Sequence, residues 1–260
     1  MIRKRKIWVL ALFAVLGLCT VATAAVIQRG NLRLTVLSLI QPYRLSRTGT
    51  DPIAVFISGH VGTTDKTIPP QLERMTVKVN HHGLLQSEGL PVCGISKIQP
   101  STTTRALHVC GPALIGSGQF WANIVLPGQK TYPTRGRLLV FNGRQGNHPA
   151  ILAHVFTSDP FATSFVIVFR IRRISDDTYG TQLSASFPQA LGTWGYLNRI
   201  KLTLRRDYRY RGKVRSYFNA GCPAPKGFDR TSYPLALATF YFAGQIQMST
   251  TVTKNCGVKE

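Results

Sequence analysis

After residue 25, apolar and polar side chains alternate with a period of two along most of the chain. The segment LRLTVLSLI, residues 32–40, is typical of this pattern, and β-branched and aromatic residues recur in similar segments. Such a periodicity places successive side chains on opposite faces of an extended strand and does not match the spacing of a helix. The pattern predicts strands at 32–40, 52–58, 74–79, 118–126, 137–141, 150–157, 164–174, 181–187, 199–204, 208–218, 237–243 and 246–253.

Turn signals separate these candidate strands at intervals of roughly 8 to 15 residues, a spacing that favours antiparallel hairpins. We therefore expect residues 26–260 to form an all-β unit, an antiparallel β-sandwich, with two sandwich-like lobes within it as an alternative. The segment NGRQGNHP at 142–149 has the composition of a linker. Because apolar strands flank it closely, we interpret it as a long hairpin turn and not as a domain boundary.

One segment departs from the strand pattern and predicts a short helix near residues 102–110. In PSTTTRALHVCGPA, serine and threonine stand where a helix is capped, and Ala106, Leu107 and Cys110 have helical spacing. The pair Gly111-Pro112 then provides a stop signal.

The first 25 residues have the features of an export signal. Four basic residues at 3–6 precede an apolar run, and Ala22-Thr23-Ala24 offers the small residues that a signal peptidase requires. Two alternatives remain: residues 7–27 are uncharged over about the length of an uncleaved membrane anchor, and Cys19 is a weaker candidate for lipid attachment. In each case we expect the body to be extracytoplasmic, either secreted or anchored to the membrane.

The cysteines agree with export. Beyond the leader the chain has an even number of cysteines, which in an exported protein predicts disulfides. Proximity in the sequence favours Cys93 with Cys110 and Cys222 with Cys256, although four cysteines allow three connectivities and free thiols are a further alternative. No C-x-x-C or paired Cys/His spacing predicts a metal site.

The formal net charge is +22, or +18 without the four basic leader residues, and it indicates attraction to anionic partners. The densest basic segment is RIKLTLRRDYRYRGKVRSYF at 199–218. If the turn near residues 211–213 has an odd number of loop residues, alternation directs Tyr208, Tyr210 and Val214 to the core and leaves Tyr217 on the basic side. The predicted anion-binding residues on the solvent side are Lys201, Arg205, Arg209, Arg211, Lys213 and Arg215. Since stacking platforms for single-stranded nucleic acid need aromatic and basic groups on one surface, we expect no specific nucleic-acid binding.

The sequence favours a protein without catalysis, and it predicts no catalytic residue, no metal site and no cofactor. It has no H-E-x-x-H motif, no G-x-S-x-G motif and no phosphate-binding glycine motif. An extracellular hydrolase, which would need a histidine beside a carboxylate or serine, is an alternative. A carrier of a small molecule or lipid, which would need an apolar cavity between sheets, is another.

Several phrases resemble an uncharacterised family of exported, β-rich proteins from high-GC Gram-positive bacteria. They are GLPVC at 89–93, GRLLVFNGR at 136–144, ILAHVF at 151–156, YGTQLSASFPQALGTWGYL at 179–197 and AGCPAPKGF at 220–228. The resemblance spans nearly the whole chain after the leader and implies one continuous unit and disulfides among the four cysteines. It brings no known activity or ligand. We therefore expect a cell-envelope protein that binds anionic wall polymer or a membrane surface through a basic sheet face.

Overall fold

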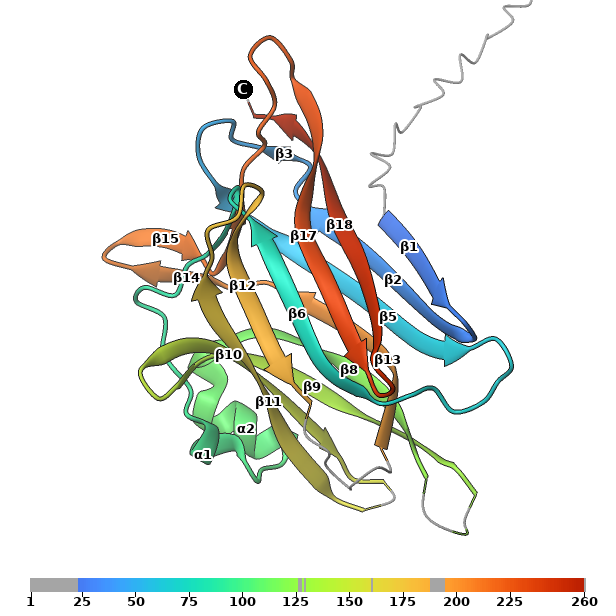
Figure 1. The fold of residues 1–260 in the computed structure, drawn as a ribbon. Coiled ribbons are helices and arrows are strands. Elements are labelled where there is room, and N and C mark those ends of the chain that lie inside the picture. Colours follow the sequence, from blue (N-terminus) through green and yellow to red (C-terminus); the bar gives the residue numbers. More distant parts are fainter. Residues whose placement is uncertain (1–22, 126–127, 129, 160, 188–194, 260) are drawn as a thin grey trace, which may run out of the picture.

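The computed structural model describes residues 23–125, 128, 130–159, 161–187 and 195–259 (Figure 1). Leader residues 1–22, which include Cys19 and Ala22, lie outside the described residues. The strands are β1 Thr23–Arg29, β2 Leu32–Gln41, β3 Arg44–Leu45, β4 Asp51–Pro52, β5 Ala54–Thr63, β6 Leu72–Asn80, β7 Gly83–Leu85, β8 Leu114–Ile124, β9 Tyr132–Gln145, β10 His148–Thr157, β11 Thr163–Arg173, β12 Tyr179–Ser186, β13 Gly195–Leu204, β14 Asp207–Tyr210, β15 Lys213–Ser216, β16 Phe218–Ala220, β17 Arg230–Phe242 and β18 Ile246–Val258. The helices are α1 Ile95–Ile98, α2 Thr103–Cys110 and the 3-10 turn η1 Gly111–Ala113.

The predicted all-β fold is confirmed. One curled sheet has the strand order β1-β2-β5-β13-β8-β9-β10-β11-β12-β6-β17-β18-β3, and its pairings are antiparallel except for the parallel pair of β18 and β3. The sheet curls until its two ends approach each other, with β17 and β18 beside β1 and β2 in Figure 1. Buried side chains of β2 and β5 pack there against Phe242 and Met248 of β17 and β18. A single sheet therefore supplies both facing layers of the sandwich.

Each of the twelve predicted strands corresponds to strand structure, although several boundaries shift by a few residues. The segment 142–149 is not a long turn, because β9 and β10 pair as far as Gln145 and His148 and leave only Gly146 and Asn147 between them. Strand β1 begins at Thr23, inside the segment assigned to the leader, and pairs with β2 along its whole length. Helix α1 and the short strands β3, β4 and β7 have too few residues to show a period in the sequence.

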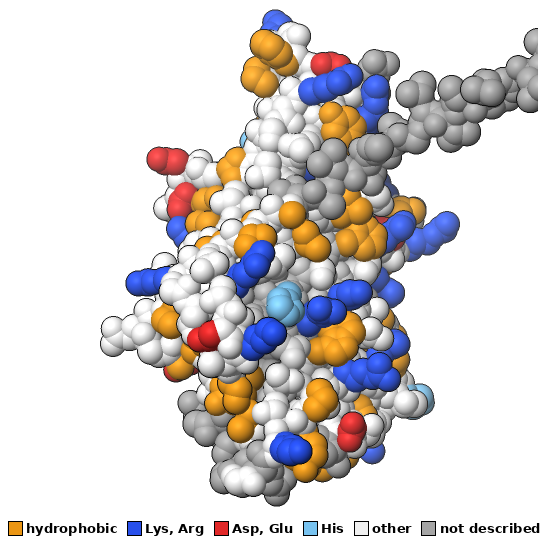
Figure 2. Space-filling view, turned by 90° about the vertical axis from the view of Figure 1, so that its right-hand side faces the viewer, with side chains coloured by type: hydrophobic (Ala, Val, Ile, Leu, Met, Phe, Trp, Pro, Cys, Tyr) orange, Lys and Arg blue, Asp and Glu red, His pale blue; other side chains and the backbone are white. Residues whose placement is uncertain are grey.

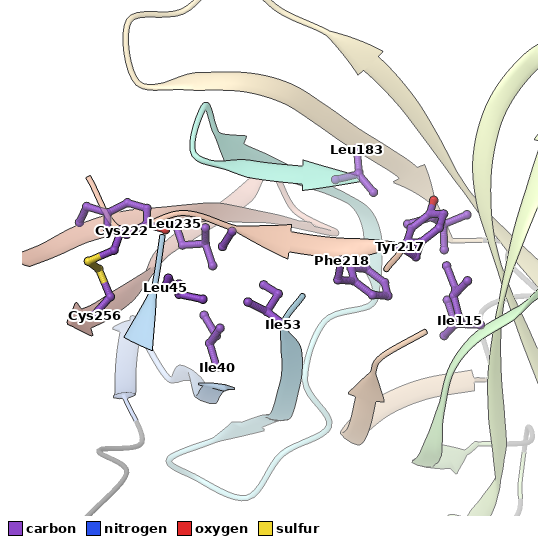
Figure 3. Close-up of a cluster of buried hydrophobic side chains, with 14 of the residues drawn as sticks. Ile40, Leu45, Ile53, Ile115, Leu183, Tyr217, Phe218, Cys222, Leu235 and Cys256 are labelled. Atoms are coloured by element: carbon purple, nitrogen blue, oxygen red, sulfur yellow. A yellow bond between two sulfur atoms is a disulfide. The ribbon is translucent and has the colours of Figure 1, made fainter. Parts of the chain in front are cut away.

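The largest buried cluster lies between the curled sheet and the small strands (Figure 3). Tyr217 and Phe218 lie edge to face with ring centroids 4.8 Å apart, and Tyr217 is 1% exposed. At the other end of the cluster, the predicted Cys222–Cys256 disulfide joins the segment after β16 to β18. Two fully buried cysteines thus link the small sheet to the last strand of the large one.

The predicted helix is also confirmed, as α2. The Thr102 side chain accepts a hydrogen bond from the Arg105 amide, which caps the first turn as the sequence pattern indicates. Helices α1 and α2 cover the outer face of β9 and β10, where Phe141 and Leu152 are fully buried beneath them. The Cys93–Cys110 disulfide fixes the end of α2 to a segment that is hydrogen-bonded to β9 at Asn142.

Both predicted disulfides form, and disulfides persist in oxidising compartments outside the cytoplasm. No helix in the described ranges has the length and apolar character needed to cross a bilayer.

Candidate anion-binding face

The strands β2, β5, β13, β8 and β9 are consecutive in the sheet and together display a continuous outer face. On β2, Leu32, Leu34 and Val36 are buried against β17 and β18. Alternation therefore turns the residues between them outward, and the cross-strand register fixes which residues of the other four strands lie on the same face.

The first outward row combines basic, aromatic and polar side chains. Thr35 of β2 pairs with His60 of β5, His60 with Arg199 of β13, Arg199 with Trp121 of β8, and Trp121 with Arg135 of β9. Directly opposed residues on neighbouring strands have side chains close enough to interact. Four neighbouring strands thus place a histidine and two arginines in one row with an indole ring.

A second row lies next to the first, two residues along each strand. It runs from Leu37 through Ser58, Lys201 and Gln119 to Arg137. Lys201, Gln119 and Arg137 are exposed. The second row therefore extends the cationic surface parallel to the first.

None of the five strands contains an aspartate or a glutamate. Across the described ranges, no ion pair engages a cation of this surface. We call this surface the basic face and define it by Arg33, His60, Gln119, Trp121, Arg135, Arg137, Arg199 and Lys201. Figure 2 views the molecule from the side of β1, β2 and β5 and shows Lys and Arg side chains interspersed with hydrophobic ones around a histidine.

Arg199 and Trp121 interact directly at the centre of the basic face. The guanidinium carbon of Arg199 lies 5.9 Å from the centroid of the Trp121 ring, within the range of a cation–π contact. The contact keeps the guanidinium group near the ring, and no carboxylate neutralises it in the described structure.

His60 lies between two arginines in this arrangement. Burial lowers the pKa of His60, and the nearby positive charges of Arg199 and Arg33 lower it further. A bound anion would have the opposite effect, since it stabilises the protonated imidazole.

A hollow lies at a β-bulge of β13, beside the middle of the first row. The pairing of β13 with β8 shifts between Leu197 and Arg199, so Asn198 has no partner in register. Consecutive strand residues normally face opposite sides, but Asn198 and Arg199 both line a hollow of about 240 Å³. Bulges redirect side chains in this way and are frequent beside functional sites. His60, Trp121 and Thr134 also line the hollow.

A second depression of about 390 Å³ crosses β2, β5, β13 and β8 along the neighbouring row. Its walls include Lys201, Gln119 and Ser58, together with the exposed apolar residues Leu37 and Phe56. The two depressions lie in adjacent registers, so an extended ligand could contact both.

The structure separates the six predicted anion-binding residues. Lys201 lies on the basic face, in the second row. Arg205 follows the end of β13, and the other four residues lie on the β14–β15 hairpin, three in its strands and Arg211 in its turn; the hairpin projects from the body in Figure 1. Those four are Arg209, Arg211, Lys213 and Arg215.

The prediction of which side chains face the core and which face solvent is wrong for the hairpin residues after the turn. The pairing of Tyr210 with Lys213 leaves two loop residues, Arg211 and Gly212, both with positive φ. Two-residue turns of this kind match the twist of hairpin strands. An even number of loop residues exchanges the faces, so Val214 is 68% exposed instead of buried.

The exchange also places basic groups beside the tyrosines. Tyr208 is directly opposite Arg215, and the guanidinium carbons of Arg215 and Arg211 lie 5.0 and 5.2 Å from the centroid of the Tyr210 ring. Tyr217, expected on the basic side, is buried in the core because the hairpin ends before it.

Carboxylates already engage two of the six predicted residues. Arg205 binds Asp207 Oδ2 through Nε and Nη2 at 3.1 and 3.0 Å. Arg215 donates to Glu88, and this hydrogen bond and the positive charge of Arg215 lower the pKa of the Glu88 carboxyl. The hairpin therefore carries less unbalanced positive charge than its sequence suggests, in contrast to the basic face.

Two of the histidines away from the basic face contact backbone carbonyls. His81 and His154 are hydrogen-bonded through Nε2 to the carbonyls of Asp176 and Ser101 at 2.7 and 3.0 Å. Among the described residues, no group of three or more His, Cys, Asp or Glu side chains is arranged to hold a metal ion.

The sequence patterns identified only Lys201 of the basic face and missed Arg33, His60, Gln119, Trp121, Arg135, Arg137 and Arg199. A usable signal exists, because 32–41, 54–63, 114–124, 132–145 and 195–204 are strand segments with no acidic residue. That signal does not show that these strands are neighbours. Comparison of the sequence with protein-family models and with curated proteins finds no match, and no solved structure matches the fold.

Proposed function

We propose that the protein is a non-catalytic protein of the cell envelope that binds an anionic envelope polymer through the basic face. One observation carries the proposal: two adjacent rows of cationic and polar side chains cross five strands that contain no acidic residue. A surface with a single sign of charge attracts anionic chains and raises their rate of encounter. The leader-like segment and the two disulfides support a location outside the cytoplasm.

The shape of the face favours a polymer over a membrane surface. The cations lie in rows on a sheet with two depressions between them, and Trp121 is half-buried beside Arg199. Membrane-surface binding commonly relies on apolar side chains that project into the lipid interface. Rows of cations along a hollowed sheet suit a chain with charges at repeated intervals.

The test measures binding of the purified protein to a linear poly(glycerol phosphate) chain, with neutral dextran and phosphatidylglycerol vesicles for comparison. With about five phosphate contacts, affinity for the chain is expected to fall about 100-fold between about 50 and 200 mM salt, because bound counterions are released. Affinity that does not change with salt would contradict the proposal, as would tighter binding to the vesicles.

Paired substitutions locate the binding surface. Arg135→Gln with Arg137→Gln is expected to weaken binding about tenfold or more, since each cation near an anionic surface contributes about 1 kcal/mol. Arg172→Gln with Arg173→Gln, two exposed arginines of β11, is the matched control and should change affinity less than twofold. Arg209→Gln with Lys213→Gln tests the hairpin. A larger loss of affinity for this pair than for the β9 pair would show that the polymer binds at β14 and β15.

A further inference from the structure

The hollow beside the bulge of β13 differs from the rest of the basic face because an aromatic ring, a guanidinium group and an imidazole line it together. Arg199 and His60 line it, and Arg33 lies close enough to His60 to lower the pKa of the imidazole. Trp121 of β8 forms part of the wall. The imidazole of His60 on β5 and the guanidinium group of Arg199 on β13 therefore reach the hollow from two neighbouring strands.

Some polar groups that line the hollow already form hydrogen bonds within the protein. The Thr134 hydroxyl contacts the Thr157 hydroxyl at 2.8 Å and donates to the backbone carbonyl of Asp159, whose side chain is exposed. Asn198 donates from Nδ2 to Asn123 Oδ1 at 3.3 Å. The carboxamide oxygen of Asn198 can still accept a hydrogen bond, since an asparagine side chain has both donors and an acceptor.

The size of the hollow limits its occupant. At about 240 Å³ it is smaller than the pockets of roughly 300 to 1,000 Å³ that enclose drug-sized ligands. A single polymer unit fits this volume better than an extended segment. The ring of Trp121 provides a flat apolar surface, and the side chains around it provide positive charge and hydrogen-bonding groups.

We propose that this hollow is the subsite for one phosphate-substituted sugar unit of the polymer. This inference rests on the proposed binding of an anionic polymer. The sugar ring lies against Trp121, and its phosphate is directed toward Arg199 and His60. A phosphate offers acceptor oxygens in several directions, which suits separate donors on two strands, His60 of β5 and Arg199 of β13. A planar carboxylate is satisfied by a single guanidinium group in a fork geometry. The Asn198 carboxamide accepts a hydrogen bond from a sugar hydroxyl.

The experiment titrates the purified protein with glucose 1-phosphate, inorganic phosphate, methyl glucoside and glucuronate. Affinity and the NMR pKa of His60 are measured for each compound. Glucose 1-phosphate is expected to bind at least tenfold more tightly than the other three and to raise the pKa of His60, since a nearby anion stabilises the imidazolium. Equal affinity for inorganic phosphate or glucuronate would overturn the assignment to a sugar phosphate.

Variants of Trp121 and Arg199 separate the two parts of the subsite. Trp121→Ala is expected to reduce affinity for glucose 1-phosphate to that for inorganic phosphate, whereas Trp121→Phe, which keeps a flat ring, retains most of it. Arg199→Gln is expected to weaken the binding of both glucose 1-phosphate and inorganic phosphate. Tyr132→Ala removes an exposed ring at the start of β9 and is the control.

Melting temperatures show whether each variant is folded, and if Trp121→Ala is not, Trp121→Phe and Arg199→Gln carry the comparison. An unchanged preference for glucose 1-phosphate in a folded Trp121→Ala protein would overturn the subsite. If poly(glycerol phosphate) binding still depends on Arg135 and Arg137, only the subsite fails and the proposed function remains.

Discussion

Gly89 lies directly against the ring of Tyr210: a Cβ atom built on Gly89 would be 2.1 Å from Tyr210 Cδ2. Gly89 also has a φ of +79°, a conformation that other residues adopt at a cost. This contact joins the segment before α1 to the β14–β15 hairpin, and together with the hydrogen bonds from the Tyr208 hydroxyl to the carbonyls of Gln86 and Glu88 it holds the hairpin to the body.

We expect Gly89→Ala to lower the free energy of unfolding by about 2 to 4 kcal/mol, because overpacking and an unfavourable φ act together. Gly30→Ala is the matched control, with a φ of +61° and no atom within 4 Å of the added Cβ. Gly30→Ala should lower the free energy of unfolding only by the cost of the positive φ, about 1 kcal/mol. Urea unfolding measures both, and equal costs would contradict the contact with Tyr210.

We expect buried Lys254 to make the protein more stable as the pH becomes alkaline. It is 3% exposed, and its Nζ donates to the carbonyls of Ile40 and Pro42 at 2.9 and 2.8 Å. Burial lowers the pKa of Lys254 to about 8. Between about pH 8 and 10.5 the unfolded chain binds more protons at this residue than the folded chain, so stability increases with pH.

The expected increase from Lys254 is up to about 1.4 kcal/mol per pH unit between about pH 8 and 9.5. Lys254→Met should remove it, whereas Lys226→Met, at an exposed lysine, should retain it. Urea unfolding at several pH values gives the comparison. Parallel stability curves for the wild type and Lys254→Met would show that Lys254 titrates normally in the folded protein.

We expect buried His154 to make the protein less stable in mild acid. It is fully buried on β10, and its Nδ1 has no hydrogen-bond partner in the described structure. Burial lowers the pKa of His154, and the hydrogen bond to the Ser101 carbonyl only partly opposes this. Below about pH 6.5 the unfolded chain takes up a proton that the folded chain does not, so stability falls as pH decreases.

We expect His154→Gln, which can still donate to Ser101, to have a smaller decrease in the free energy of unfolding between pH 6.5 and 5 than the wild type. His148→Gln, at an exposed histidine near the start of β10, is the control and should follow the wild type. The difference is expected to approach 1.4 kcal/mol per pH unit, as a ceiling of about that size applies to one proton. Identical acid dependence in all three proteins would show that His154 is not the group responsible.

The two disulfides are expected to contribute unequally to stability. They close loops of 17 and 34 residues, and the chain-entropy relation gives about 3 kcal/mol for Cys93–Cys110 and about 4 kcal/mol for Cys222–Cys256. Thermal unfolding of the double alanine variant of each pair measures the contributions. Since Cys222–Cys256 lies in the main core, its loss should also unfold the region around β16, whereas loss of Cys93–Cys110 should affect mainly α1 and α2.

The sequence alone determined the local structure of this protein. The period-two pattern predicted its main strands, the serine and threonine capping residues and Gly111-Pro112 predicted α2, and the positions of the cysteines favoured the two disulfides that form. These features depend on residues close in the chain, or on a cross-link between residues a few tens of positions apart, so short-range patterns are sufficient to predict them.

Only the tertiary structure decided where the charges lie. Strand β13 is inserted between β5 and β8, which brings Arg199 between His60 and Trp121, residues separated from it by many tens of positions. In the hairpin, a turn of two residues instead of an odd number reversed the faces of Arg215 and Val214. Alternation fixes a face within one strand, but the side that faces solvent depends on which strands become neighbours and on the length of each turn.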